Sequence, residues 1–495
     1  MSTVVAETTA PRAQAEQSGF VKAMTLTDAT MLVAGSMIGS GIFIVSADIA
    51  RTLPSPFWLL ATWVVTGVMT LLGALAYGEL AAMFPRAGGQ YVFLRESMGP
   101  LMGFLYGWTL FLIIQTGTIA AVAVAFGRFL GVLIPSIGPD RFTWFPRIDF
   151  AISGGAVEVG LSPQRVIALI SIWVLTWINL RGVREGKLVQ TTLTVVKTGA
   201  LALLVLLGLT IGRNTEALRA NFAPGQFMGA LPLDSVLVLG FGAALVGSLF
   251  SSDAWNNVTF AAAEVKNPQR NLPLALLLGT GLVSVLYVLA NFAYLNTLPL
   301  VGTADGARVI ARGMQYATQD RVGTAAAEVL FGSSGTVLMA SAILISTFGC
   351  NNGLILAGAR VYYAMARDGL FFKRAGTLNA KAVPAAGLII QSIWVSLLCL
   401  TGTYGQLLNY VIFAALVFYV LTTIGLFILR AKLPNADRPY RAVGYPVLPG
   451  LYVLLAAAVS VILLIAPKTR TEALSGLVLV LIGIPVYFIW RRVEA

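Results

Sequence analysis

The sequence predicts an all-α polytopic membrane protein. Its 495 residues are 57% hydrophobic and only 11% charged, whereas a soluble domain is about 25% charged. The mean hydropathy is +0.83. Long apolar runs that contain Gly and Pro indicate membrane helices, because the strands of a membrane barrel are short and alternate apolar with polar residues. The bilayer is therefore the expected solvent and partner for most of the chain.

Twelve apolar runs are candidates for spanning helices, each of which needs roughly 20 residues. The runs are 27–50, 56–84, 98–133, 165–181, 185–211, 234–262, 272–297, 332–366, 384–402, 404–430, 446–466 and 473–490. Residues 1–26 are polar, and they predict a disordered cytoplasmic tail without a signal peptide.

The distribution of Lys and Arg predicts the orientation of these spans. If both termini are cytoplasmic, the cytoplasmic segments hold 19 of the 33 basic residues and the outer segments hold 11. An excess of basic residues favours the cytoplasmic side. The net charge of +12 comes from basic residues between the apolar runs, where they orient the spans, and not from a soluble basic domain. We therefore expect no nucleic-acid partner. The short loops and the absence of a cysteine pair favour a bacterial inner membrane as the plasma membrane concerned.

The residue types exclude several kinds of chemistry. The chain contains no histidine, which excludes a His-ligated metal and a Ser-His-Asp triad. Its two cysteines, Cys350 and Cys399, lie in apolar runs and predict neither a disulfide framework nor a zinc site. No nucleotide-binding loop is present, so ATP is not the expected energy source. We expect no enzyme activity, no cofactor and no metal.

The first run contains many small residues at mid-membrane. Gly35, Ser36, Gly39, Ser40 and Gly41 fall within seven positions. A glycine inside a helix costs roughly 1 kcal/mol relative to alanine, so this stretch predicts a local interruption. The alternative is close helix packing, because Gly35 and Gly39 form a G-x-x-x-G pair.

The sixth run is interrupted by polar residues. Ser251, Ser252, Asp253, Asn256 and Asn257 lie within an otherwise apolar stretch. A carboxylate at the centre of a membrane helix costs roughly 3 kcal/mol. We therefore expect Asp253 to face a cavity rather than lipid.

The two interrupted runs lie five spans apart, as do the two longest runs. This spacing predicts two related halves, residues 27–211 and 234–430, followed by two further spans within 446–490. Matching interruptions in two halves mark the central site of many transporters. An unwound helix offers N–H groups to a carboxylate and carbonyl oxygens to an ammonium. These are the two charged ends of an amino acid.

Several motifs, taken together and in order, resemble the amino acid–polyamine–organocation transporters, and within them the L-type amino acid transporters. The motifs are Gly39-Ser40-Gly41-Ile42-Phe43, Tyr77-Gly78-Glu79-Leu80, Gly88-Gly89-Gln90-Tyr91, Phe250 with Trp255-Asn256, Glu264 with Asn267-Pro268-Gln269-Arg270-Asn271-Leu272-Pro273, Phe348-Gly349-Cys350-Asn351-Asn352-Gly353, and Ala366-Arg367-Asp368-Gly369. The resemblance extends over residues 20–495. It implies a LeuT-type fold, in which a five-plus-five inverted repeat and two extra helices make 12 transmembrane helices.

The resemblance also implies a substrate site at the two interruptions. The substrate carboxylate would meet the backbone of the first, the ammonium would meet carbonyls of both, and Phe250 would cover the substrate as an aromatic gate. The side-chain pocket would be lined by Trp255 and Asn256. The implied substrate-binding residues are Ser36, Met37, Gly39, Ser40, Gly41, Ile42, Phe250, Ser251, Asp253, Trp255 and Asn256.

Lys197 lies near the middle of the fifth run, about 12 residues from its start. A lysine at this depth is usually functional, since long side chains reach the interface mainly from helix ends. Lys197 matches a lysine of the family whose ammonium takes the place of a sodium ion in sodium-coupled relatives. The resemblance therefore implies transport without obligatory sodium coupling, and it leaves proton coupling open.

Two features depart from the L-type pattern. The pattern has a small residue where Asp253 stands. An acid there could neutralise the substrate ammonium, favour a cationic side chain, pair with Lys197, titrate during transport, or cap the interrupted helix. The outer loop at about 134–164 is long, rich in Gly and Pro, and has no cysteine. We therefore expect no disulfide-linked heavy chain.

Three further charges lie within or beside spans. We expect Glu79 to pair with a base or cap a helix, Arg128 to reach the outer interface, and Arg360 to pair with an acid near the cytoplasmic side.

The expected function is secondary active transport of an amino acid by alternating access. Sodium-independent uptake or exchange of small or neutral L-amino acids is the main hypothesis. The alternative, which Asp253 motivates, is transport of a cationic amino acid, an amine or a polyamine, with or without proton coupling. A channel would need a continuous polar pore, whereas the polar groups at membrane depth concentrate at the two interruptions.

Overall fold

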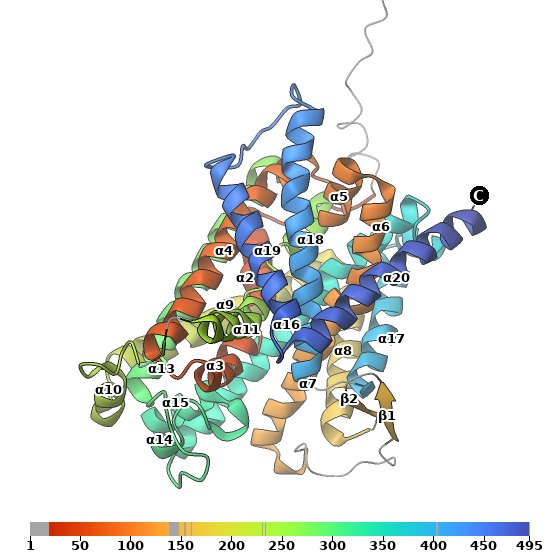
Figure 1. Ribbon diagram of the computed structural model, residues 1–495. Helices are drawn as coiled ribbons and strands as arrows, with labels where there is room; N and C mark the ends of the chain where they lie inside the picture. The colour runs from red at the N-terminus through yellow and green to blue at the C-terminus, as the bar shows by residue number, and fades with distance from the viewer. Residues whose placement is uncertain are drawn as a thin grey trace, which may run out of the picture.

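The computed structural model describes residues 19–494 except residues 138–147, 153–154, 160, 230, 233 and 402–403. Within these residues, ten helices are long and apolar enough to cross a membrane. Figure 1 shows them gathered in one bundle. The helices α5 and α15 mark its two ends, which we call the α5 end and the α15 end. The predicted all-α membrane architecture is confirmed.

Helices account for the first five predicted spans. The elements are α2 (Leu26–Met37), α3 (Gly41–Thr52), α4 (Pro56–Met83), α5 (Gln90–Met98), α6 (Pro100–Thr109), the π-helical turn η1 (Leu110–Ile114), α7 (Gln115–Leu133), η2 (Pro135–Ile137), α8 (Pro163–Leu180), α9 (Val183–Leu209) and α10 (Thr215–Phe222). Local sequence explains where several begin: Thr25 and Asp28 form a capping box at α2, and a proline occupies the first turn of α4 and of α8.

The remaining helices supply the other predicted spans. They are α11 (Ser235–Ser251), α12 (Asn257–Phe260), η3 (Ala262–Glu264), α13 (Pro268–Thr297), α14 (Val309–Arg312), η4 (Thr318–Asp320), α15 (Val322–Phe331), α16 (Ser333–Arg367), η5 (Lys373–Gly376), α17 (Ala385–Thr401), α18 (Tyr404–Lys432), α19 (Val447–Ile465) and α20 (Arg470–Glu494). Two predicted spans, α11 and α17, are shorter than the ten long helices.

The loop predicted at 134–164 contains secondary structure that the sequence did not indicate. Strands β1 (Ile148–Ile152) and β2 (Gly155–Val159) form an antiparallel hairpin, with Phe150 opposite Val157. The hairpin lies beside α17 at the α15 end (Figure 1). Such a hairpin satisfies its backbone polar groups locally, as a long loop at a membrane surface requires.

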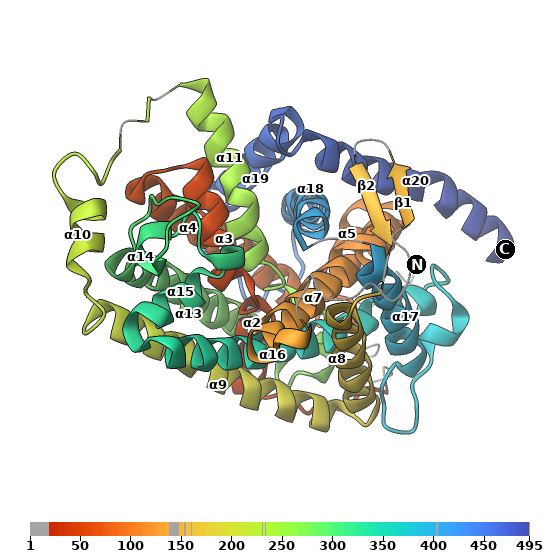
Figure 2. The ribbon, with the colours of Figure 1, turned by 90° about the horizontal axis from the view of Figure 1, so that it is seen from below.

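The two interrupted spans lie inside the bundle. α13 packs along α2 and α4, while α16 packs against α2, α7 and α9. Figure 2 shows α3 and α11 running toward the centre of the bundle, where α2 and α16 lie. The core is therefore built around the two predicted interruptions rather than around a continuous helix.

The chain before the first span is tied to the end of the sixth. Met24 forms a parallel bridge with Val265. Its N–H donates to the Glu264 carbonyl at 2.9 Å, and its carbonyl accepts from the Lys266 N–H at 2.8 Å. The last residues of the predicted cytoplasmic tail are thus paired, whereas residues 1–18 lie outside the described part of the chain.

Candidate functional site

The first interruption lies between α2 and α3. α2 ends at Met37, and Ile38 follows it in an extended conformation. α3 begins at Gly41 without a side-chain cap. The last carbonyls of one helix and the first N–H groups of the next therefore lack helical partners, which gives opposite partial charges at a single place.

The second interruption separates α11 from α12. α11 ends at Ser251, and residues 252–256 are not helical. Ala254 has φ 63°, in the left-handed region that side chains with a Cβ rarely adopt. Asn256 precedes α12 without a side-chain cap. Asp253 lies three residues before Asn256, so it is not the residue directly preceding α12.

The two interruptions lie side by side. The hydroxyl of Tyr287, on α13, is 3.0 Å from the carbonyl oxygen of Met37 and 3.1 Å from that of Ser251. Gly41 approaches Ser251 so closely that a Cβ at position 41 would overlap the serine side chain. This glycine is therefore required by packing between the interruptions, and one tyrosine bridges their bared carbonyls.

Lys197 extends from α9 to the first interruption. Its Nζ is 2.5 Å from the Gly35 carbonyl oxygen, 2.7 Å from that of Ile38 and 3.3 Å from that of Ser346. The side chain is buried. The ammonium thus satisfies carbonyls that the end of α2 leaves without partners, and it joins α2 to α9 and α16.

Ser346 and Cys350, on α16, complete this attachment. The Ser346 hydroxyl lies 3.1 Å from the carbonyl oxygens of both Ile38 and Gly39. The Cys350 thiol donates to the Ser36 carbonyl at 3.0 Å. Cys350 is therefore a buried free thiol with a local role. The first interruption is held from two sides by groups that donate to its carbonyls.

Asp253 is buried and accepts a hydrogen bond from the Tyr419 hydroxyl, on α18, at 2.5 Å. The same hydroxyl is 3.4 Å from Oδ1 of Asn256. Among the described residues, no ion pair joins Asp253 to Lys197. The lysine is committed to backbone carbonyls, so the carboxylate stands at the second interruption without a cation from α9.

Two small cavities flank Asp253 and Tyr419. One, of about 10 Å³, reaches Gln90, Tyr106 and Gln115. The other, of about 20 Å³, reaches Trp255, Met69 and Tyr452. Because Asp253 and Tyr419 line both, their hydrogen-bonded pair separates the two spaces.

Aromatic rings and amides surround this pair. The ring of Tyr77 lies 4.7 Å from that of Trp255, in an edge-to-face arrangement, and the Trp255 ring lies 5.3 Å from that of Tyr419. The Asn256 amide donates to Gln90 at 2.7 Å. The Gln90 amide in turn donates to a threonine hydroxyl on α18 at 3.0 Å. The predicted pocket residues Trp255 and Asn256 are thus held against α4, α5 and α18.

A larger cavity, of about 330 Å³, opens at the α5 end. Its charged lining residues are Lys22, Arg86, Arg95, Arg367 and Asp368. Arg86 and Arg95 each form an ion pair with Glu96, at 2.9 and 2.8 Å. Burial by itself raises the pKa of Glu96, but the hydrogen bond from Arg95 and the charge of Arg86 outweigh it, so the pKa lies below its ordinary value.

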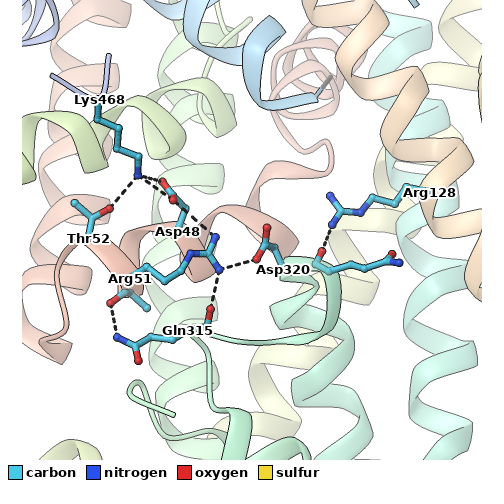
Figure 3. A network of polar contacts seen from close by, with 9 residues as sticks. Asp48, Arg51, Thr52, Arg128, Gln315, Asp320 and Lys468 are labelled. Carbon is cyan, nitrogen blue, oxygen red and sulfur yellow. Dashed lines mark hydrogen bonds and ion pairs between the residues drawn. The ribbon is translucent and has the colours of Figure 1, made fainter. Parts of the chain in front are cut away.

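A polar network crosses the bundle at the α15 end (Figure 3). Lys468, between α19 and α20, is 3.0 Å from both carboxylate oxygens of Asp48 on α3. Arg51, one turn further on, is 2.7 Å from Asp320 in η4 and 2.7 Å from the Gln315 carbonyl. α3 is thereby tied to the segment before α15 and to the turn before α20.

The structure brings together all the residues that the sequence indicated for the site. All of them are buried. Those of the second interruption from Asp253 onward border the two small cavities, whereas those of the first lie where the interruptions meet. The residues concerned are Ser36, Met37, Gly39, Ser40, Gly41, Ile42, Lys197, Phe250, Ser251, Asp253, Trp255 and Asn256.

Several contributors were not identified from the sequence, among them Tyr287, Tyr419 and Gln90. Tyr287 shares its apolar run with Tyr294, and Tyr419 shares its run with Tyr410, so nothing in the sequence singles out either residue. Gln90 belongs to a motif used for the resemblance, but no role had been inferred for it. Only contacts between distant segments distinguish these residues from other polar side chains.

The weaker candidates have partners in the structure. Glu79 pairs with Arg430 at 2.6 Å and with Arg438 at 3.2 Å, which confirms the expected pairing with a base. Arg360 pairs with the buried Glu264 at 2.9 Å, which confirms the expected pairing with an acid. Arg128 donates to the carbonyl of Gln319 at the α15 end (Figure 3), so it binds another loop instead of only reaching the interface.

Comparison with known proteins identifies the family. Residues 24–487 match the model of the family described as amino acid permease. The chain is 29% identical to the large neutral amino acids transporter small subunit 2 of Mus musculus, over 97% of this chain and 84% of that protein. It is 29% identical to the serine/threonine exchanger SteT of Bacillus subtilis, over 97% of this chain and 99% of that protein. It is 27% identical to the b(0,+)-type amino acid transporter 1 of Homo sapiens, over 95% of this chain and 88% of that protein.

The family match covers most of the chain and agrees with the ten long apolar helices and the two interruptions. Permeases carry solutes and perform no chemistry on them, in agreement with the expectation of no enzyme activity. The chain belongs to the amino acid permease family and is an integral membrane protein that transports amino acids.

Proposed function

We propose that the protein exchanges or takes up small or neutral L-amino acids by alternating access, without sodium. The observation that carries the proposal is the position of the Tyr287 hydroxyl between the carbonyls of Met37 and Ser251, which puts the two interruptions at one place. Two adjacent interrupted helices provide both polarities that a zwitterion needs.

The substrate carboxylate would bind the start of α3. This helix begins at Gly41 without a side-chain cap, so its first N–H groups and its dipole favour an anion. The ammonium would bind carbonyls at the end of α2 and α11. The carbonyls of Ser36 and Met37 accept from Cys350 and Tyr287, and each retains a second lone pair for the substrate. Phe250 would cover the substrate as the gate.

Lys197 supports independence from sodium. Its ammonium binds three carbonyls, including that of Ser346 on α16, and so supplies a fixed positive charge beside the first interruption. A sodium ion at this place would also need oxygen ligands and would be repelled by the ammonium. Sodium coupling through this position is therefore disfavoured.

The small cavities support a small substrate. The pocket beside Trp255 and Asn256 is divided by the Asp253–Tyr419 pair into spaces of about 10 and 20 Å³. A short side chain is accommodated by smaller movements than a large aromatic one. The serine/threonine exchanger among the relatives agrees with this size.

The distribution of basic residues between the two ends of the bundle supports one orientation in the membrane. We infer that the α5 end, with both termini, is cytoplasmic, because the basic loops lie there. The cavity of about 330 Å³ would then be the cytoplasmic vestibule, and the network in Figure 3 would close the outer side. We also infer a bacterial inner membrane, the five-plus-five inverted repeat of residues 27–211 and 234–430, and function without a disulfide-linked heavy chain.

Counterflow in proteoliposomes tests the proposal. Vesicles with purified protein are loaded with unlabelled serine, and uptake of labelled serine is followed with alanine, leucine, arginine and putrescine as competitors, with and without sodium and a pH gradient. We expect saturable uptake that small neutral amino acids inhibit and that sodium does not change. Dependence on sodium, or inhibition by arginine or putrescine alone, would contradict the proposal.

A cationic amino acid or amine is the second candidate, and Asp253 favours it. The carboxylate is buried at the second interruption, and its neighbours Tyr419 and Trp255 carry aromatic faces that suit a cation. If arginine is a substrate, Asp253→Asn should abolish its uptake while sparing that of serine.

A further inference from the structure

An apolar groove lies on the surface between α18 and α19, the two helices joined by the long loop at the α5 end in Figure 1. Its volume is about 630 Å³, and its lining includes Phe427, Val447, Gly450, Leu451 and Leu454. Val447 and Leu454 are 70% and 69% exposed. Helices that span a membrane present such a groove to acyl chains.

Basic residues gather at one end of this groove. The ring of Phe427, in the groove, lies 5.1 Å from the ring of Tyr445. The guanidinium of Arg430 lies 3.7 Å from the same tyrosine ring. Lys432 ends α18, and the loop that follows adds Arg438 and Arg441. Lys432 and Arg441 are exposed, whereas Arg438 pairs with Glu79. The groove therefore passes directly from apolar side chains to cationic ones.

The start of α19 adds to this positive potential. The helix begins at Val447, in the groove, and Pro446 precedes it without a side-chain cap. Its dipole places a partial positive charge at the groove's basic end. Two acids, Glu79 and Asp437, lie among the four basic residues 430, 432, 438 and 441, so the cluster retains an excess of positive charge.

We propose that this groove binds an anionic phospholipid, with an acyl chain between α18 and α19 and the phosphate at Arg441 and the start of α19. The occupant must combine a long apolar body with an anionic head, because the lining is apolar along its length and cationic at one end only. Lipids of this kind are attracted by basic residues at membrane depth on the cytoplasmic side.

The groove lies on the back of the substrate site. α18 carries Tyr419, which binds Asp253, and α19 carries Tyr452, which lines the adjoining cavity. Leu451, next to Tyr452, lines the groove. A lipid in the groove therefore packs against α18 and α19, the helices that carry Tyr419 and Tyr452. Its binding should stabilise the arrangement of these two helices without contact with substrate.

Two variants test the head and the body of the lipid separately. Arg441→Gln removes a cation at the head. Gly450→Leu fills the groove, and no atom lies within 4 Å of a Cβ built at this helical glycine, so the variant should fold. Gly199→Leu is the matched control, because Gly199 is also a helical glycine with no atom within 4 Å of an added Cβ. Gly199 lies on α9, away from the groove.

The measurement is lipid binding to the purified full chain, by native mass spectrometry with phosphatidylglycerol and with phosphatidylcholine as probes. We expect the wild type to retain phosphatidylglycerol in preference. Arg441→Gln should weaken this binding about fivefold, which is the contribution of one basic residue to the binding of an anionic lipid near a membrane surface. Gly450→Leu should weaken the binding of both lipids, whereas Gly199→Leu should bind as the wild type does.

Equal retention of both lipids by the wild type would overturn the anionic head. Unchanged binding in Gly450→Leu would overturn the position of the groove. A dimer in the wild type that Gly450→Leu converts to a monomer would assign the groove to a second copy of the chain and would also overturn the proposal.

Discussion

Replacing Lys197 by alanine tests how the first interruption is held. The side chain donates to the carbonyls of Gly35, Ile38 and Ser346. After its removal, Ile38 keeps the Ser346 hydroxyl at 3.1 Å, and the Ser346 carbonyl keeps its place within α16. The Gly35 carbonyl, at the end of α2, loses its donor and has no helical replacement.

The expected magnitude follows from that one carbonyl. A buried polar group left without a partner costs about 1–3 kcal/mol. If this free energy falls on the conformation that transports, the rate decreases about 5- to 150-fold. The global fold should survive, because the other donors to the interruption remain.

The assay is the initial rate of serine counterflow, with thermal unfolding of the same samples as the control for folding. Lys197→Met separates the charge from the space that the side chain fills, and it should be as defective as Lys197→Ala. A wild-type rate in Lys197→Met would refute the reasoning, since it would show that the interruption does not need the ammonium. Sodium-stimulated transport in Lys197→Ala would show that the vacated position accepts the ion.

Three further substitutions address separate contacts. Tyr287→Phe removes the hydroxyl between the two interruptions, and transport should fall about 5- to 30-fold, the equivalent of 1–2 kcal/mol, as measured by counterflow; an unchanged rate would mean that the bridge is dispensable. Glu79→Gln leaves the guanidinium of Arg430 without its anion and should lower the free energy of unfolding by about 3 kcal/mol, detectable as a lower unfolding midpoint, with unchanged stability as the contrary result. Glu96 has a pKa below its ordinary value of 4.5, so its ion pairs stabilise the fold above pH 4.5 and are lost as the pH falls through the lower, folded-state pKa. Between about pH 6 and about pH 3 the unfolding midpoint of the wild type should therefore decrease more than that of Glu96→Gln, and parallel curves would contradict this.

Most of the fold could be predicted from the apolar runs and from the polar residues that interrupt them. The spans were predictable because a bilayer requires about 20 apolar residues per helix, whatever the neighbours are. The interruption at Asp253 was predictable for the same reason, since polar groups at that depth need protein partners. The hairpin of β1 and β2 was not predictable, because it lies outside the apolar runs and its pairing depends on local turn geometry.

The wall of the substrate pocket was less accessible from the sequence. Tyr419 is 166 residues from Asp253 along the chain, yet their side chains are hydrogen bonded. The pairing depends on how α18 packs against α11, and no period or motif within α18 records it. The π-helical turn Leu110–Ile114 is a second example, since it rotates one half of the third span relative to the other without a distinctive residue.

The pairing of Met24 with Val265 has a practical consequence. It joins the start of the first span to the exit of the sixth, so these two half-helices should travel as a single piece during each turnover. A spin label at Lys22 would move together with these two half-helices. Its distance to a second label on α8 would therefore change as the transporter alternates between its conformations. A fusion partner attached directly before residue 22 would hinder the movement of the same half-helices, so expression tags should be placed at the C-terminus.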